Sequence, residues 1–161
     1  MSVNKHRPHI IVLPEDDANR QIANGFLQDS AVDVRQIQVL PNAGGWIKAR
    51  DAVAGSHVDA LRTYSHRYLV VLIDFDGDTS RRGEVFKEIP QDVRNRIFVI
   101  GALREPEDLR LASNLPFEAI GRQCADECRL QLRGLWDNDL LRHNAAELDR
   151  MLPVLRPILF P

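Results

Sequence analysis

The feature that most constrains the fold is an unbroken run of six residues without charge, Tyr68–Ile73, which leads directly into Asp74-Phe75-Asp76-Gly77-Asp78. An apolar run of this length is typical of a parallel strand that is buried on both faces. Three further strand-like stretches each end at a proline or glycine: Ile10–Leu13, Val32–Leu40 and Ile97–Ile100. Because parallel strands need long crossover connections, we expect helices between them.

The segments between these stretches carry apolar residues at helical spacing. They are Asp17–Gln28, Ala49–Tyr64, Ser80–Arg94 and a short helix that opens at Pro106. Gly25 is unfavourable inside the first helix, and Gly55-Ser56 is expected to divide the second into two. The repeated order of strand and helix predicts an α/β domain: a four-stranded, mainly parallel sheet with helices on both faces, in a Rossmann-like arrangement of three layers.

The last forty residues change character. Gln123–Trp136 and Asp139–Leu152 have the pattern of amphipathic helices, and Pro153–Pro161 is apolar and punctuated by prolines. Such an apolar segment is expected to pack on the domain or on a partner chain. We therefore predict an α/β domain over residues 1–121 and a C-terminal helical extension over residues 122–161, which would form the contact of a homodimer if it packs on a second copy.

Composition disfavours several classes of protein. The chain has 161 residues, a formal net charge of −2 and two cysteines. This charge disfavours a protein that coats nucleic acid by electrostatics alone, and it disfavours a polybasic membrane anchor. Two cysteines make no disulfide framework, and no apolar stretch is long enough for a signal peptide or a membrane span. The sequence thus predicts a cytoplasmic protein with no membrane partner.

Acidic residues gather where two of the predicted strands end. They are Glu15, Asp16 and Asp17 after the first strand and Asp74, Asp76 and Asp78 after the third. Ligands of open parallel sheets bind beyond the carboxyl ends of the strands. Carboxylates that converge there repel one another, and a hard divalent cation relieves the repulsion. We therefore expect a site for Mg²⁺ or Mn²⁺ whose ligands are Glu15, Asp74, Asp76 and Asp78.

Acids at strand ends also have a structural role, because they cap the helices that follow. By this interpretation Asp17 caps the first helix, and Asp78 or Thr79 caps the third. Capping does not account for the other strand-end acids, and the functional prediction rests on those.

A second candidate feature is the segment Pro41–Lys48, which joins the second strand to its helix and contains Gly44-Gly45. A glycine pair at such a turn lets backbone N–H groups approach a phosphate, and Lys48 lies one turn into the helix. A plain tight turn explains the glycine pair equally well. The other cationic candidates for phosphate contacts are Arg81, Arg82, Lys87 and Arg104.

Together, a strand-end Glu15, the Gly44-Gly45 turn and Asp74-Phe75-Asp76 resemble the TOPRIM family of topoisomerases, primases and OLD-type nucleases, over about residues 9–103. The resemblance implies that Asp74 and Asp76 bind Mg²⁺ and that Glu15 is a general acid/base or a third metal ligand. It implies a metal-dependent nuclease, a hydrolase of phosphodiester bonds in nucleic acid. It also implies a role in a defence system beside a partner ATPase.

Two positions depart from the TOPRIM pattern. Asp16 stands where the family usually has glycine, and Asn19 stands where a further acid is often found. The tyrosines Tyr64 and Tyr68 lie far from the strand ends, so neither is placed as the nucleophile of a topoisomerase. Cleavage by activated water is therefore expected, rather than strand passage.

An alternative from a different class is a receiver domain of two-component signalling. The stretch Ile11–Arg20 resembles the first strand and acidic pair of a receiver, and Asp74 then takes the position of the phospho-acceptor. Gly101-Ala102 offers no switch hydroxyl, and no lysine follows Lys87. The alternative is therefore an altered receiver that acts in signalling or as a protein-interaction domain.

Two further interpretations are disfavoured. Asp74-Phe75-Asp76-Gly77-Asp78 also resembles the motif of haloacid-dehalogenase phosphatases, but that motif opens its domain and needs a downstream lysine and acid pair. Cys124 and Cys128 share one helix face, yet only His143 follows them. We therefore expect two small buried residues rather than a zinc site.

Overall fold

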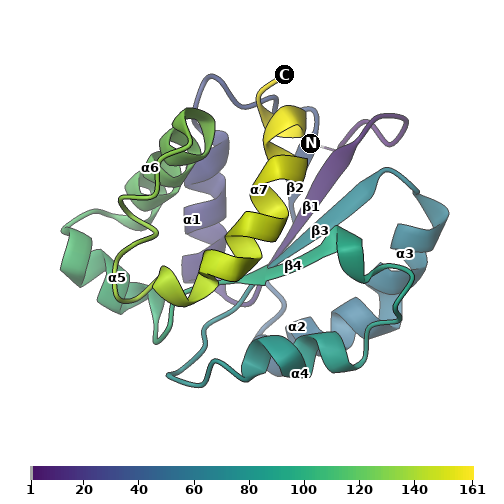
Figure 1. Ribbon diagram of the computed structural model, residues 1–161, viewed down its shortest axis with the longest axis horizontal. Helices are drawn as coiled ribbons and strands as arrows, with labels where there is room; N and C mark the ends of the chain where they lie inside the picture. The colour runs from purple at the N-terminus through teal and green to yellow at the C-terminus, as the bar shows by residue number, and fades with distance from the viewer. Residues whose placement is uncertain (1) are drawn as a thin grey trace.

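The computed structural model describes residues 2–161 and contains one four-stranded, all-parallel sheet in the order β2-β1-β3-β4 (Figure 1). The strands are β1 (His9–Pro14), β2 (Ile37–Val39), β3 (Arg67–Leu72) and β4 (Ile97–Ile100). Helices separate consecutive strands, as right-handed crossovers between parallel strands require. The predicted α/β class and its sheet are confirmed.

Two layers of helices cover the sheet (Figure 1). One face carries α2 (Trp46–Ala52), α3 (Val58–Thr63) and α4 (Arg81–Lys87). The other face carries α1 (Asp17–Leu27), α6 (Phe117–Leu130) and α7 (Ala145–Leu159), with α5 (Pro106–Ser113) beside them. Alternate strand residues face alternate layers: Ile11 and Val71 pack in the first core, and Ile10 and Val70 pack in the second. Both faces of the central strands are thus buried, as their apolar sequence predicts.

Two segments differ from their predicted boundaries for local reasons. Only residues 37–39 of the predicted strand Val32–Leu40 pair in the sheet. The residues before them form turns, in which the Gln36 N–H donates to the Asp33 carbonyl at 3.0 Å. The predicted break at Gly55-Ser56 is a π-helical turn, Val53–His57, that joins α2 to α3.

Helix α7 continues beyond Leu152, where the predicted helix ends, and runs through two prolines. Pro153 and Pro157 both lie inside the helix, on its exposed side. A proline has no N–H, so the carbonyl four residues earlier loses its hydrogen bond in the helix. These carbonyls belong to Asp149 and Pro153, which are exposed and can bond to water. The opposite side of α7 is buried against the sheet through Leu148 and Leu155, among others. The burial of this side stabilises the helix and offsets the hydrogen bonds that the two prolines remove.

Helix α6 is continuous across the boundary predicted between residues 121 and 122. It packs along α1 at a distance that glycine alone permits. A Cβ atom on Gly25 would lie 2.1 Å from the carbonyl oxygen of Glu118, and one on Gly121 would lie 1.9 Å from that of Ile22. The unfavourable mid-helix Gly25 is therefore explained by the α1–α6 contact. The C-terminal helical extension packs on the domain, because Ala125 and Leu148 share one core with Ile10 of β1.

The outer strand β4 has its free edge bonded by side chains. The Val99 N–H donates to Glu147 Oε2 at 2.8 Å, and the Val99 carbonyl accepts from Arg82 Nε at 2.8 Å. The carbonyl of Ile97 accepts from the guanidinium of Arg150. Side chains from α4 and α7 thus take the place of a fifth strand, which protects an edge that could otherwise pair with another chain.

A cavity of about 120 Å³ lies between the sheet and helices α1, α6 and α7. Cys124 and Cys128 of α6 line it among apolar side chains. Burial raises the pKa of the Cys124 thiol to about 12 and that of the Cys128 thiol to about 11. Both thiols are therefore protonated at neutral pH and line the cavity as small apolar residues.

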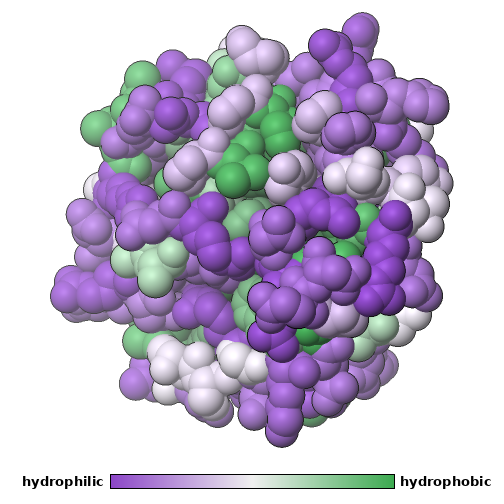
Figure 2. Space-filling model, turned by 45° about the vertical axis from the view of Figure 1, so that its right-hand side comes forward, coloured by the Kyte–Doolittle hydropathy of each residue, from purple (hydrophilic) through white to green (hydrophobic). Residues whose placement is uncertain are grey.

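Hydrophilic residues predominate on the face of the molecule drawn in Figure 2. Figure 2 shows one face on which hydrophobic residues form separate patches between polar ones. Within residues 2–161 no helix combines the length and apolar character needed to cross a bilayer.

Candidate functional site

The parallel pairing of β1 with β3 brings two groups of acids to one edge of the sheet. The register aligns Pro14 with Leu72, and the Glu15 N–H extends the ladder by donating to the Leu72 carbonyl at 2.8 Å. As a result, carboxylate oxygens of Glu15, Asp16 and Asp74 all lie within 4.8 Å of one another. We refer to these three residues as the acidic cluster.

Asn19 holds the acidic cluster together from the first turn of α1. Its Nδ2 donates to Asp16 Oδ1 and to Asp74 Oδ1, each at 2.9 Å. The Asp74 N–H donates to Glu15 Oε2 at 2.6 Å. Asp16 also accepts from the Asn19 N–H at 2.9 Å, so Asp16 caps α1 and the cap predicted at Asp17 was wrong.

The acidic cluster carries more negative charge than its surroundings neutralise. Burial, followed by the charges of Asp16 and Glu15, raises the pKa of Asp74 to about 8, although Asn19 opposes the shift. Burial, followed by the charge of Asp16, also raises the pKa of Glu15, against the hydrogen bond from the Asp74 N–H. At neutral pH the Asp74 carboxyl therefore retains its proton. A bound cation would neutralise the carboxylates and release that proton. Carboxylate and amide oxygens are the ligands that Mg²⁺ prefers, so these residues fit the expected ion.

Two predicted ligands, Asp76 and Asp78, lie outside the acidic cluster. Phe75 turns into the core between Asp74 and Asp76, which leaves the Asp76 side chain exposed. Asp76 has a positive φ of 48° and forms an ion pair with Arg81 at 3.0 Å. Asp78 is exposed, and its Oδ1 accepts from the Ser80 N–H at 3.0 Å. The chain over residues 74–78 thus turns away from the acidic cluster after Asp74.

Arg81 connects residues 74–78, the acidic segment that follows β3, to Trp46, the first residue of α2. Its Nη1 donates to the Asp74 carbonyl at 2.7 Å, and its Nη2 pairs with Asp76. The guanidinium lies 4.8 Å from the centre of the Trp46 ring, in a cation–π contact. Arg81 is therefore a fixed positive charge beside the acidic cluster.

The Gly44-Gly45 turn holds Glu15 through the backbone. The amide groups of Gly44 and Gly45 donate to the Glu15 carbonyl at 2.8 Å and 3.1 Å. These N–H groups, which the sequence assigned to a phosphate, are therefore bonded within the protein. Both glycines have positive φ, 92° and 128°, which explains the residue type. Lys48 is exposed, and a Cβ on Gly44 would lie 3.8 Å from its Nζ, so the amine lies over the turn.

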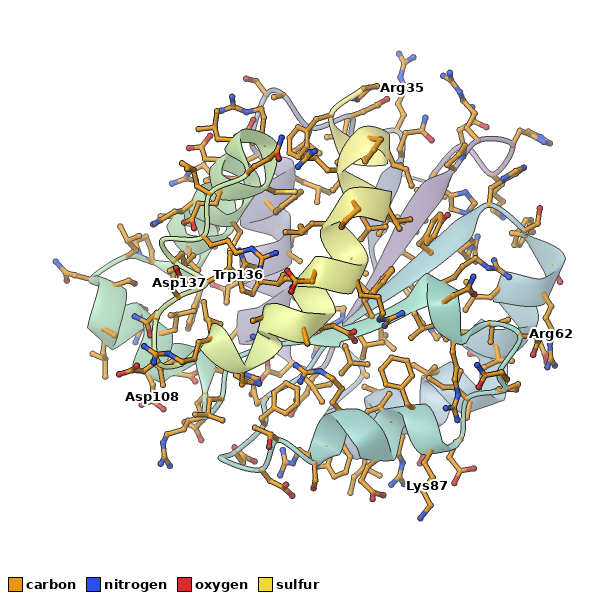
Figure 3. All side chains as sticks on the ribbon, viewed as in Figure 1. Arg35, Arg62, Lys87, Asp108, Trp136 and Asp137 are labelled. Carbon is orange, nitrogen blue, oxygen red and sulfur yellow. The ribbon has the colours of Figure 1, made fainter. Side chains whose placement is uncertain are left out.

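The remaining cationic candidates are placed differently. Arg82 donates to the carbonyl of Val99 and is committed to the β4 edge. Lys87 ends α4 and points into solvent (Figure 3). Arg104 is exposed. Its carbonyl accepts from the Asp76 N–H at 3.4 Å, which places it beside residues 74–78. Arg104 therefore lies at the same edge of the sheet as the acidic cluster.

Asp16 and Asn19 were absent from the predicted set of ligands. Their signal in the sequence was the spacing of an N-cap residue and the residue three positions later, which face the same side of a helix start. At the position of Asn19 the resemblance expects an acid. An amide there donates hydrogen bonds to two neighbouring carboxylates, which an ionised acid cannot do.

Comparison of the chain with protein-family models, with curated proteins and with solved structures gives no match. What the site can do follows from its own chemistry.

Proposed function

We propose that the acidic cluster binds Mg²⁺ or Mn²⁺ and that the protein hydrolyses phosphodiester bonds in nucleic acid. The observation that carries the proposal is the convergence of three carboxylates within 4.8 Å, one of them with a pKa of about 8. A group of acids that is costly to ionise alone becomes favourable when a divalent cation neutralises it.

The residues around the acidic cluster fit this chemistry. A bound divalent cation would stabilise charge on the phosphoryl oxygens and lower the pKa of a bound water. Burial raises the pKa of Glu15, which makes this carboxyl a better proton donor and acceptor for the reaction than an exposed glutamate. Arg81 is fixed beside the cluster, and Lys48 and Arg104 are exposed around it, as contacts to phosphate oxygens require.

The formal net charge of −2 offers little general attraction to a polyanion. We therefore include in the proposal a partner chain, such as the ATPase implied by the TOPRIM resemblance, that delivers the substrate.

The direct test is cleavage of plasmid DNA, single-stranded DNA and RNA with Mg²⁺ or Mn²⁺. Wild-type protein is compared with Asp74→Asn and Glu15→Gln. The control is Asp92→Asn, which changes an exposed acid outside the acidic cluster that pairs with Arg62 of α3. We expect metal-dependent cleavage that both cluster variants lose and the control retains. Equal cleavage by all four proteins would indicate a contaminant and reject the assignment.

The second candidate is an altered receiver in which Asp74 accepts a phosphoryl group. Two observations favour it. The cluster brings Glu15 and Asp16, the acid pair after β1, together with Asp74 after β3, while Asp76 pairs with Arg81 instead. The strand order β2-β1-β3-β4 also matches the first four strands of the doubly wound order common to flavodoxin-like folds. Incubation with acetyl phosphate and Mg²⁺ tests it. One added phosphoryl group, absent from Asp74→Asn, together with no nuclease activity, would favour this candidate.

A further inference from the structure

A hollow of about 620 Å³ lies at the outer edge of the sheet, remote from the acidic cluster. Its wall includes Tyr68, near the start of β3, and Arg96, the residue immediately before β4. These positions are at the amino ends of the strands, whereas the acidic cluster lies at their carboxyl ends. The hollow also receives Phe86 from α4 and Arg150 from α7, so it opens between the two helical layers.

The hollow is positively charged. Three guanidinium groups line it, those of Arg94, Arg96 and Arg150, against the single carboxylate of Glu147. Glu147 is buried, and it is already bonded to the Val99 N–H and paired with Arg150 at 2.8 Å. Within residues 2–161, Arg94 and Arg96 form no ion pair. The side chains of Arg94 and Arg96 therefore have no carboxylate at ion-pair distance, and the nearby charge of Asp92, which pairs with Arg62, acts on Arg96 from further away.

These two guanidinium groups are held in place by backbone carbonyls. Arg94 donates through Nε to Ile89 at 2.8 Å and through Nη2 to Phe86 at 3.0 Å. Arg96 donates through Nη1 to the carbonyls of Tyr64 and Arg67, at 3.1 Å and 3.0 Å.

The remaining donors of these arginines are free for a ligand. Arg94 Nη1 and Arg96 Nε and Nη2 have no acceptor in the part of the chain that the structure describes. A fixed arginine with free donors loses little entropy when it binds an anion, and its planar group matches a phosphate.

We propose that this hollow binds the phosphate group of a nucleotide. The arginines supply the charge and the fixed donors that phosphate needs. The same wall carries the ring of Tyr68 and the side-chain amides of Gln91 and Asn95, while the ring of Phe86 lies under the Arg150 guanidinium, 5.5 Å from it. Aromatic rings stack on a base, and amides pair with its polar edge. The site is independent of the acidic cluster and of the proposed nuclease activity.

The test measures binding of ADP, inorganic phosphate and an oligothymidylate to the full chain by calorimetry, in EDTA so that no divalent cation reaches the acidic cluster. Asn95→Asp places a carboxylate in the hollow without removing an arginine. Its matched control is Asn24→Asp, which makes the same change of charge at an exposed position of α1. We expect Asn95→Asp to weaken ADP binding by about tenfold, as a repulsive charge at a binding site does, and Asn24→Asp to leave it unchanged.

The three ligands separate the sources of the phosphate. ADP that binds more tightly than inorganic phosphate supports a nucleotide site, because the nucleoside then adds contacts. Binding of the oligothymidylate without binding of ADP would overturn the nucleotide assignment in favour of a nucleic-acid backbone. Absence of binding by all three ligands, or equal weakening by Asn95→Asp and Asn24→Asp, would overturn the proposal. Because EDTA is present, such a failure leaves the metal site untouched.

Discussion

The chemistry of Asp74 is set by its position in the fold. The residue follows β3 directly and is only 7% exposed, and its carboxylate lies beside those of Glu15 and Asp16. Water cannot stabilise its charge, and the single amide of Asn19 does so in part. Its pKa of about 8 is the result, and it couples stability to pH.

We expect the contribution of Asp74 to the free energy of unfolding, measured without divalent cations, to fall as the pH rises from about 5 to about 8. Through this range the folded chain keeps a proton on Asp74, whereas the unfolded chain has lost it, so rising pH favours the unfolded state. Burial lowers the pKa of the His9, His57 and His143 side chains, which acts in the opposite direction.

Urea unfolding at several pH values, for wild-type protein and Asp74→Asn, isolates the contribution of Asp74. The decline should be smaller in Asp74→Asn by at least about 1 kcal/mol over this range. The same decline in both proteins would show that Asp74 ionises normally.

At the scale of elements, the crossing of α1 and α6 depends on two glycines. Gly121→Ala puts a methyl group 1.9 Å from the Ile22 carbonyl oxygen, so the helices must separate. We expect a loss of about 3 kcal/mol or more in the free energy of unfolding, as overpacking of rigid backbone produces.

The matched control is Gly83→Ala in α4, where the added methyl group meets no atom within 4 Å. This substitution should stabilise the chain by up to about 1 kcal/mol, because alanine favours helix. If both variants unfold at the same urea concentration, α1 and α6 do not cross as closely as described.

A second prediction at this scale concerns the side chains that form hydrogen bonds with the backbone at the edge of β4. Glu147→Ala leaves the Val99 N–H without its partner, and we expect it to cost about 3 kcal/mol and to promote self-association through the exposed edge. Glu147→Gln keeps an acceptor and should cost less. Urea unfolding and sedimentation of both variants test this; equal losses and no self-association would mean that Glu147 does not protect the edge.

The sequence predicted those elements whose pattern is set by burial alone. The apolar run Tyr68–Ile73 matches β3 to within one residue at each end, because both faces of that strand are covered. The end of the last helix was misplaced, because packing against the sheet carries α7 through Pro153 and Pro157. Helix propensity disfavours that path, and only the tertiary contacts of α7 make it stable.

The candidate site was predictable where it depends on strand order and not where it depends on local turns. Glu15 and Asp74 were expected together because adjacent parallel strands end at one edge, and the structure brings them together. The separation of Asp76 depends on the burial of Phe75 and on the positive φ of Asp76. The Asp-x-Asp spacing does not reveal that turn.

In the molecule as a whole, acidic and basic side chains gather at opposite ends of the parallel strands. The carboxyl ends of β1 and β3 carry the acidic cluster, and the amino ends of β3 and β4 carry the hollow lined by arginines. A formal net charge of −2 therefore conceals two regions of opposite sign. The two proposals, a divalent cation at one end and a phosphate at the other, rest on this separation of charge.

The central claim, that the acidic cluster binds a divalent cation, is tested most directly by calorimetric titration of the full chain with Mn²⁺. We expect binding to the wild-type protein, loss of at least about tenfold in affinity for Asp74→Asn, and little change for Asp78→Asn, whose carboxylate lies outside the cluster. Equal affinity in wild-type protein and Asp74→Asn, or no binding to the wild-type protein, would contradict the claim.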